Sequence, residues 1–155
     1  MTSFVDIVNA ENTALDEIKD VPPLPVGSYL VMVNGNYEAV KSGQKQTDGM
    51  QFNLRVLQAR EDVDPEALSA HLEASNRTLM DITLKHTIWD SPYALTSLRD
   101  FLRDTLQING SLPPKQALAE VPGKQFIVSM IHRPFTDNSG NARLRAEIGS
   151  TARAL

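Results

Sequence analysis

Residues 50–56 alternate strictly between apolar and polar side chains, and this alternation constrains the fold more than any other part of the sequence. Its apolar positions are Met50, Phe52, Leu54 and Val56. A period of two places neighbouring side chains on opposite faces of a strand, so this segment is predicted to be a strand with one buried face. The chain therefore builds part of its core from a β-sheet.

Four further segments have the composition of strands, and they cover residues 28–37, 79–89, 125–132 and 142–148. Gly35 inside the first segment indicates a bulge or a sharp bend. The second segment alternates again, with His86 among its apolar residues. The last two segments are separated by a polar, glycine-bearing turn and are predicted to form a hairpin.

Two helices are predicted between the strands. Asp64 and Pro65 combine an N-cap residue with proline at the first helical position, which predicts a short helix that ends near Ala74. Ser91-Pro92 repeats this signal and opens a helix that runs to about Gln107. The residues that this second helix is expected to bury are Leu95, Leu98, Leu102 and Leu106.

The order strand, strand, strand, helix, strand, strand is that of the OB-fold. We therefore expect a mainly β fold with α-helix: a five-stranded, OB-fold-like Greek-key barrel with a helix between strands 3 and 4. An open α+β sheet with the helix on one face is the main alternative. The 155 residues, 41% of them hydrophobic, suit one such domain.

The N-terminal segment differs from the rest of the chain in charge. Its ionisable residues are Asp6, Glu11, Asp16, Glu17 and Asp20 against Lys19, a net charge of −4. Its apolar residues Phe4, Ile7, Val8, Leu15 and Ile18 have loosely helical spacing. The proline-rich run at 22–25 ends any helix there. We expect an acidic arm at 1–20, a binding domain at 21–150 and a short tail at 151–155.

The sequence offers no catalytic or metal-binding pattern. It has no cysteine, which removes disulfides, thiol nucleophiles and most structural zinc sites. Its histidines, His71, His86 and His132, fall on separate elements and have no metal-site spacing. We therefore expect no enzyme activity, no metal and no cofactor. No signal peptide and no apolar run long enough for a membrane span are found, so the expected location is the cytoplasm.

Cationic and aromatic residues at outward strand positions and in loops form the candidate binding site. Proteins that hold single strands combine a basic groove with aromatic platforms for the bases. The candidates are Lys41, Lys45, Arg55, Lys85, Trp89, Tyr37, Arg133, Phe135, Arg143 and Arg145. The competing interpretation is an ordinary solvated surface for the cations. For the aromatics it is packing, and Trp89 would then lie under the second helix.

A series of short motifs runs along the chain from PPLPVGSYLV at 22–31. It continues through Lys41-Ser42-Gly43, QFNLRV at 51–56, Leu98-x-x-Phe101-Leu102 and PGKQFIV at 122–128. In this series, which covers roughly residues 21–150, the chain resembles small phage-encoded single-stranded DNA-binding proteins with OB-like folds.

The resemblance implies a non-catalytic protein that coats single-stranded DNA during phage replication or recombination in the host cytoplasm. It also implies replication or recombination proteins as partners, and a homo-oligomer remains open. Many such binders end in an acidic tail, whereas the acidic segment here is N-terminal. The arm is hypothesised to compete with DNA for the basic groove or to recruit a partner. The alternative function is an OB-like protein-interaction or virion-structural module, and a metal-dependent nuclease is a third, weaker one.

Overall fold

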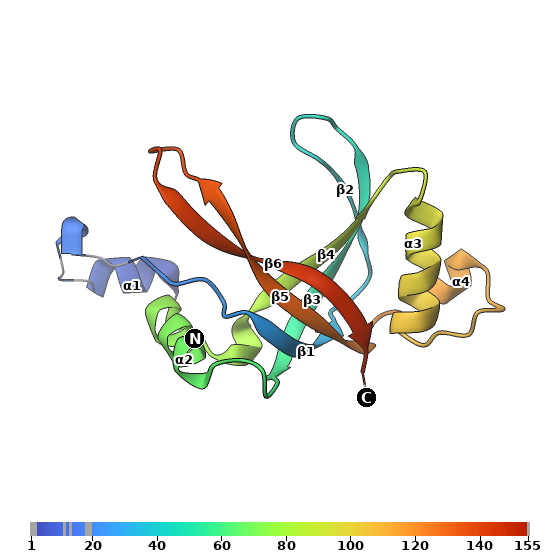
Figure 1. Ribbon diagram of the computed structural model, residues 1–155, viewed down its shortest axis with the longest axis horizontal. Helices are drawn as coiled ribbons and strands as arrows, with labels where there is room; N and C mark the ends of the chain where they lie inside the picture. The colour runs from blue at the N-terminus through green and yellow to red at the C-terminus, as the bar shows by residue number, and fades with distance from the viewer. Residues whose placement is uncertain (1–2, 11, 13, 18–19, 155) are drawn as a thin grey trace.

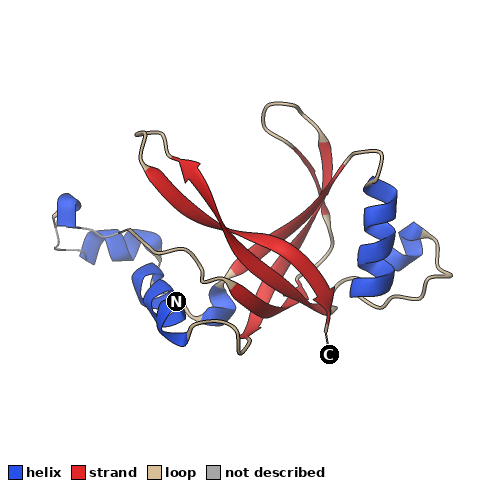
Figure 2. Cartoon of the chain, in the orientation of Figure 1, coloured by secondary structure: helices blue, strands red, loops and turns tan. Residues whose placement is uncertain are grey.

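The structure is a computed structural model that describes residues 3–10, 12, 14–17 and 20–154. Glu11, Ile18 and Lys19 of the acidic arm lie outside the described residues, as does the side chain of Ile7. Figure 1 shows a twisted sheet at the centre with helices at both ends, and Figure 2 shows that strands make up most of the body. No helix in the described ranges is long and apolar enough to cross a membrane.

Six antiparallel strands form the sheet, so the expectation of a mainly β fold with helices is confirmed. They are β1 (Gly27–Val33), β2 (Glu38–Lys41), β3 (Asp48–Ala59), β4 (Thr83–Trp89), β5 (Gln125–Thr136) and β6 (Ala142–Arg153). The predicted count of five is wrong, because the segment expected as one strand at 28–37 divides into β1 and β2. Both pair with the same edge of β3, and the chain bends between them at Gly35, where φ is +81°. The bend at this glycine was predicted.

Strand β3 pairs with three other strands, with β1 and β2 along one edge and β4 along the other. The order β5-β1-β3-β4 is the 4-1-2-3 order of a Greek key, and β6 pairs with β5 beyond it. The predicted barrel is not closed: over the described residues, no ladder joins β4 to β6. These two strands therefore face each other with unpaired edges.

Several strand boundaries differ from those predicted, and β3 extends beyond 50–56 at both ends. The segment expected to start a strand at Leu79 instead forms the 3-10 turn η2 (Leu79–Asp81). This turn is fixed because the Thr78 hydroxyl donates to the Asp81 carboxylate at 2.8 Å, and β4 begins only at Thr83. Strands β5 and β6 end at Thr136 and Arg153, beyond their predicted ends, and their hairpin projects from the body of the sheet (Figure 1).

Helical segments cover both ends of the sheet. They are α1 (Phe4–Ala10), η1 (Leu15–Glu17), α2 (Pro65–Ser75), α3 (Ala94–Asp100), η3 (Phe101–Thr105) and α4 (Pro114–Ala119). The predicted cap of α2 is confirmed, since the Asp64 carboxylate accepts from the Glu66 amide at 3.1 Å. The predicted burial of Leu95 is wrong: its side chain is 77% exposed. It lies in the first turn of α3 and lines two surface clefts, one of which is formed with Met50 of β3 and Ile88 of β4.

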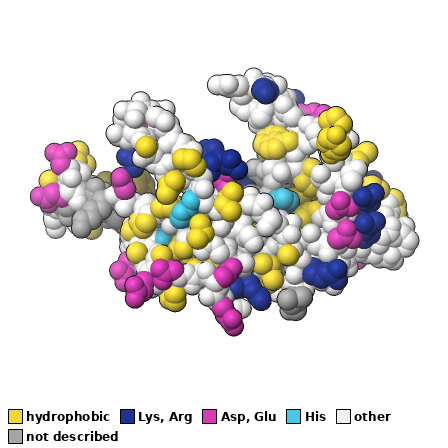
Figure 3. Space-filling model, in the orientation of Figure 1, with side chains coloured by type: hydrophobic (Ala, Val, Ile, Leu, Met, Phe, Trp, Pro, Cys, Tyr) yellow, Lys and Arg dark blue, Asp and Glu magenta, His cyan; other side chains and the backbone are white. Residues whose placement is uncertain are grey.

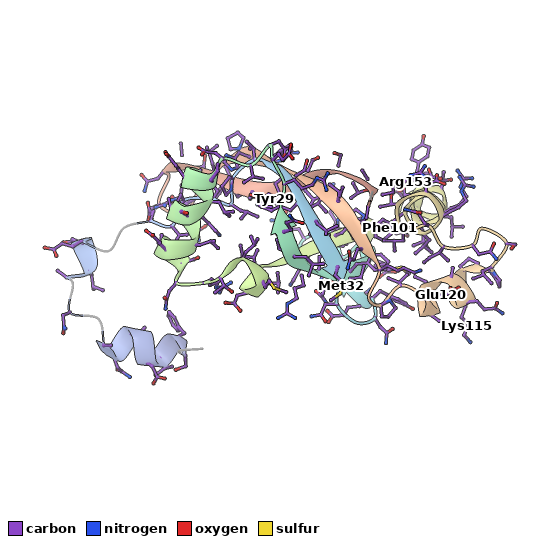
Figure 4. The ribbon with its side chains drawn as sticks, turned by 90° about the horizontal axis from the view of Figure 1, so that it is seen from below. Tyr29, Met32, Phe101, Lys115, Glu120 and Arg153 are labelled. Carbon is purple, nitrogen blue, oxygen red and sulfur yellow. The ribbon has the colours of Figure 1, made fainter. Side chains whose placement is uncertain are left out.

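One hydrophobic core joins the helices to the sheet, and an aromatic cluster lies in it. The ring of Phe101 lies 5.0 Å from that of Phe52 and 5.2 Å from that of Phe126, centroid to centroid. It also lies 4.8 Å from the ring of His86. Figure 4 shows Phe101 at the helical end of the sheet, with Tyr29 farther along it. Phe101 thus contacts β3, β4 and β5 at once, and Leu98, Leu102 and Leu106 add to the packing of the α3–η3 helix on the core.

Replacing Tyr29 with Phe should destabilise the fold without changing its shape. The Tyr29 side chain is fully buried, and its hydroxyl donates to the Pro25 carbonyl at 2.8 Å. Loss of this bond leaves a buried acceptor without its donor, so the free energy of unfolding should fall by about 1 kcal/mol. Urea denaturation followed by circular dichroism measures this change. Tyr93→Phe is the matched control, because Tyr93 is 73% exposed; an equal loss in the control contradicts the assignment.

Candidate nucleic-acid interface

A groove runs between the free edges of β4 and β6, where the sheet fails to close. It has a volume of about 620 Å³. The wall from β4 consists of Thr83, Leu84, Lys85, His86, Thr87 and Trp89. The opposite wall consists of Met130 and residues 146–151 of β6. The groove therefore has an apolar floor, continuous with the core, and polar rims.

Two hairpins project on either side of this groove. Figure 1 shows the β2–β3 hairpin and the β5–β6 hairpin diverging upward from the sheet. In Figure 3 the surface is notched between the two projections, and Lys or Arg side chains are visible in the notch. Lys41 and Lys45 lie on the first hairpin, and Arg143 and Arg145 lie on the second. The fold thus brings predicted cations from distant parts of the sequence to both sides of one opening.

Lys85 and Trp89 are the two predicted site residues that line the groove itself. Both are exposed at outward positions of β4, as the alternation predicts. The Trp89 ring lies over Gly49 of β3, where an added Cβ would lie 2.6 Å from a ring carbon. The side chain is 42% exposed and also borders a second hollow next to α3. Trp89 is therefore not packed under the helix, and one face of its ring is accessible.

Arg133, Phe135 and Arg145 lie together on the outward face of the β5–β6 hairpin. Arg133 and Arg145 are opposite each other in the ladder, and both donate to the Glu147 carboxylate, Arg145 at 2.9 Å. The guanidinium carbon of Arg145 lies 5.6 Å from the centre of the Phe135 ring. Phe135 therefore supports an arginine and is half-buried by it. Hydrogen bonding to Arg133 holds the pKa of Glu147 below its usual value, so this carboxylate is charged at neutral pH.

Arg143 bridges two carboxylates near the tip of the same hairpin. It donates to Asp137 in the turn, and its Nη1 lies 2.8 Å from a carboxylate oxygen of Asp20. The hydrogen bond from Arg143 lowers the pKa of Asp137. Asp20 belongs to the acidic arm, so the arm contacts one of the predicted DNA-binding residues. This contact is exposed, with Asp20 at 78% accessibility.

The remaining predicted residues lie outside the groove. Lys41 pairs with Asp48 at 3.1 Å on the β2–β3 hairpin. Arg55 is on the outward face of β3 and donates to the Met80 carbonyl at 3.1 Å. Tyr37 is 42% exposed, and its ring lies 6.5 Å from the core ring of Phe52. The Tyr37 side chain thus packs partly against the core and is partly exposed to solvent.

Sequence reasoning missed the carboxylates that pair with the predicted cations. Glu147 lies two residues after Arg145 on an alternating strand, which places both on one face. That spacing was a usable signal for Arg145. The second partner, Arg133, depends on the β5–β6 register, which the turn at 137–141 sets by pairing Thr136 with Ala142 and Arg133 with Arg145. A polar, glycine-bearing turn of five residues predicts a hairpin without specifying which residues pair across it.

The three histidines do not form a common site. His71 and His132 each contact a backbone carbonyl, of Pro22 at 2.6 Å and of Leu24 at 2.8 Å. His86 lies in the aromatic cluster, and burial lowers its pKa. In the described part of the chain, no group of three or more His, Asp or Glu side chains is arranged to hold a metal ion.

Burial of His86 should make the fold less stable in mild acid. Its pKa in the folded state lies below the unfolded value near 6.5, so the unfolded chain binds the proton more readily. The buried, neutral imidazole therefore stabilises the fold fully above the unfolded pKa. This stabilisation is lost as the pH falls from that value toward the lower pKa of the folded state. Urea titrations at pH 7 and pH 5 should show a smaller acid loss for His86→Leu than for the parent chain. Equal losses contradict the argument.

Comparisons with known proteins place this chain in no group. It matches no protein-family model and no curated protein. Among solved structures, yeast RPA bound to ssDNA is similar over 93% of this chain and 83% of that chain, at 11% sequence identity. The TM-score of that superposition is 0.31, which is too low to establish a common fold. The fold and the site therefore rest on the strand pairing and on the groove alone.

Proposed function

We propose that the protein is a non-catalytic single-stranded DNA-binding protein and that the strand lies in the groove between β4 and β6. The observation that supports this most is the groove itself. It is open at the surface and carries Lys85 and an accessible Trp89 on one wall. Hairpins that bear further cations rise on both sides of it (Figure 3).

A single strand suits this chemistry better than a duplex does. Its bases are free to stack on an aromatic ring, and each nucleotide carries a phosphate for a cation. Trp89 offers one ring face, and Lys85 lies two side-chain positions away along the same outward face of β4. Thr83 and Thr87 add hydroxyls on this wall. Such a site binds with little dependence on base sequence.

The arrangement also supports assignment to the OB-fold, the finer fold class that we propose. An OB-fold is a partly open Greek-key barrel that binds oligonucleotides on its second and third strands and with two loops. If β1 and β2 count as one bent strand, the second and third strands are β3 and β4. The two loops are then 42–47 and 137–141, which lie at the tips of the two projecting hairpins.

The ion pairs at the site leave its arginines available to phosphate. Arg133, Arg143 and Arg145 are paired with carboxylates, and all three remain partly exposed. Exposed ion pairs contribute little, typically about 0–1 kcal/mol, so a phosphate can replace a carboxylate at low cost. Over the described residues, no ion pair joins Lys85 or Lys45 to a carboxylate. A phosphate can therefore bind these two lysines without first replacing a carboxylate.

We further propose that the protein is phage-encoded and coats strands exposed in replication or recombination in the host cytoplasm. The binding domain is then residues 21–150, preceded by the acidic arm at 1–20 and followed by the tail at 151–155. The whole ten-residue cation and aromatic set of the sequence analysis belongs to the interface, with Lys85 and Trp89 at its centre. The resemblance to phage proteins motivates this role.

Removing the two groove residues should weaken binding in distinguishable ways. Trp89→Ala should reduce affinity for a mixed-sequence single strand by about 5- to 150-fold, the range of one lost stacking contact. Lys85→Gln should weaken binding and reduce the slope of log affinity against log salt by about 0.7, one phosphate contact. Fluorescence anisotropy of a labelled oligonucleotide at several salt concentrations measures both effects.

Two residues outside the groove provide matched controls. Tyr93→Ala removes an aromatic ring that is 73% exposed, and Lys115→Gln removes a cation from α4. Neither residue lines the groove, so neither change should alter affinity. Stronger binding of duplex than of single strand, or no binding to either at low salt, refutes the proposed function.

Glu147→Gln should strengthen single-strand binding and steepen its salt dependence. The change removes a negative charge from the groove wall and releases Arg133 and Arg145. We expect a several-fold rise in affinity at moderate salt, measured by the same anisotropy titration. If the Glu147 pairs instead fix the arginines in a binding geometry, affinity falls. Thermal unfolding of the variant separates either effect from loss of fold.

A second candidate function is favoured by the unpaired edges of β4 and β6. Such edges accept an added strand, so the domain would serve as a protein-interaction or virion-structural module. Oligomerisation with no response to nucleic acid in the anisotropy titration is the outcome that favours it.

A further inference from the structure

The helix α1 of the N-terminal arm carries apolar side chains that are largely exposed to solvent among the described residues. Phe4, Val5 and Val8 are 78%, 64% and 55% exposed, and Leu15 farther along the arm is 85% exposed. Figure 4 shows α1 standing away from the body of the protein. An exposed apolar cluster of this kind usually marks a contact surface. The arm therefore presents an exposed apolar face that another surface could cover.

A cleft of matching chemistry lies at the other end of the molecule, between α3, η3 and α4. Its volume is about 220 Å³, which accommodates one large apolar side chain. The apolar lining includes Leu95, Leu98, Leu102, Ile108, Leu112 and Ala117. Leu95 is the most exposed of these, at 77%, and is a large apolar residue with no cover.

The charges of the arm and the cleft are complementary. The arm places Asp6 beside its apolar helix face, and Asp16 and Glu17 beside Leu15. The charged residues that line the cleft are Arg99 and Arg103, and no carboxylate lines it. Both arginines pair with exposed aspartates of the same helix, in contacts weak enough to be exchanged.

The arm and the cleft lie at opposite ends of the molecule (Figure 1). The base of the arm is also held on the side away from the cleft, by the ion pair between Asp20 and Arg143 of the β5–β6 hairpin. We propose that the arm of one copy binds the α3–α4 cleft of a second copy, with Phe4 as the side chain that fills it. The contact is heterologous, so its repetition gives a head-to-tail chain of molecules.

Sedimentation velocity of the full chain without DNA, over a range of protein concentrations, tests this directly. The mean mass should rise with concentration. Phe4→Asp on the arm and Leu95→Asp in the cleft should each weaken association by about tenfold or more. Both residues are largely exposed, so neither change threatens the core. Val26→Asp, at a half-exposed residue outside both surfaces, is the control and should leave the mass unchanged.

Mixing the two variants distinguishes a head-to-tail contact from any other. Phe4→Asp retains an intact cleft and Leu95→Asp retains an intact arm, so an equimolar mixture should form dimers that neither forms alone. The proposal is overturned if the parent chain has one mass at all concentrations, which means that the arm does not bind another copy. It is also overturned if the mixture stays monomeric. Because no DNA is present, these results are independent of the proposed function.

Discussion

The packing of Phe101 determines how the sheet ends. Its ring contacts Phe52 of β3, His86 of β4 and Phe126 of β5, and so it lies across the inner side of the sheet near the unpaired edge. Hydrophobic packing of the α3–η3 helix there bridges strands that a closed barrel would join by hydrogen bonds. Side chains of this helix therefore fill the core beside the gap between β4 and β6, and the groove lies over that packed core.

The electrostatics of the site follow from the same gap. Strand β6 places Glu147 on the groove wall, and the neighbouring strand turns Arg133 toward it. Arg143 is held by Asp137 and by Asp20 of the arm. The cations around the groove are therefore largely neutralised in the unbound protein, consistent with its net charge of −4. Under the proposed function, a single strand would bind these arginines by replacing their carboxylate partners.

Periodicity and turn chemistry predicted the local structure well, but they did not predict how strands distant in the sequence pair. The alternation at 50–56, the Asp64 cap and the turn at 137–141 depend on neighbouring residues, and the structure confirms them. Contacts between residues that are distant in the sequence decide three other features: the division into β1 and β2, the open sheet and the exposure of Leu95. Among the site residues, alternation placed Lys85 and Trp89 correctly on the surface. The pairing of Arg133 with Glu147 follows from the register of β5 with β6, and that of Arg143 with Asp20 follows from where the arm lies; neither is encoded by a local pattern.

Trp89 is the only tryptophan in the chain. Its ring lies against Gly49, where any larger residue would collide with it, and the side chain also borders the groove. With excitation at the red edge of the indole band, where the three tyrosines absorb little, the emission of the unlabelled protein originates from this one side chain. A ligand that contacts Trp89 in the groove should therefore change the fluorescence of the protein, with no background from a second indole.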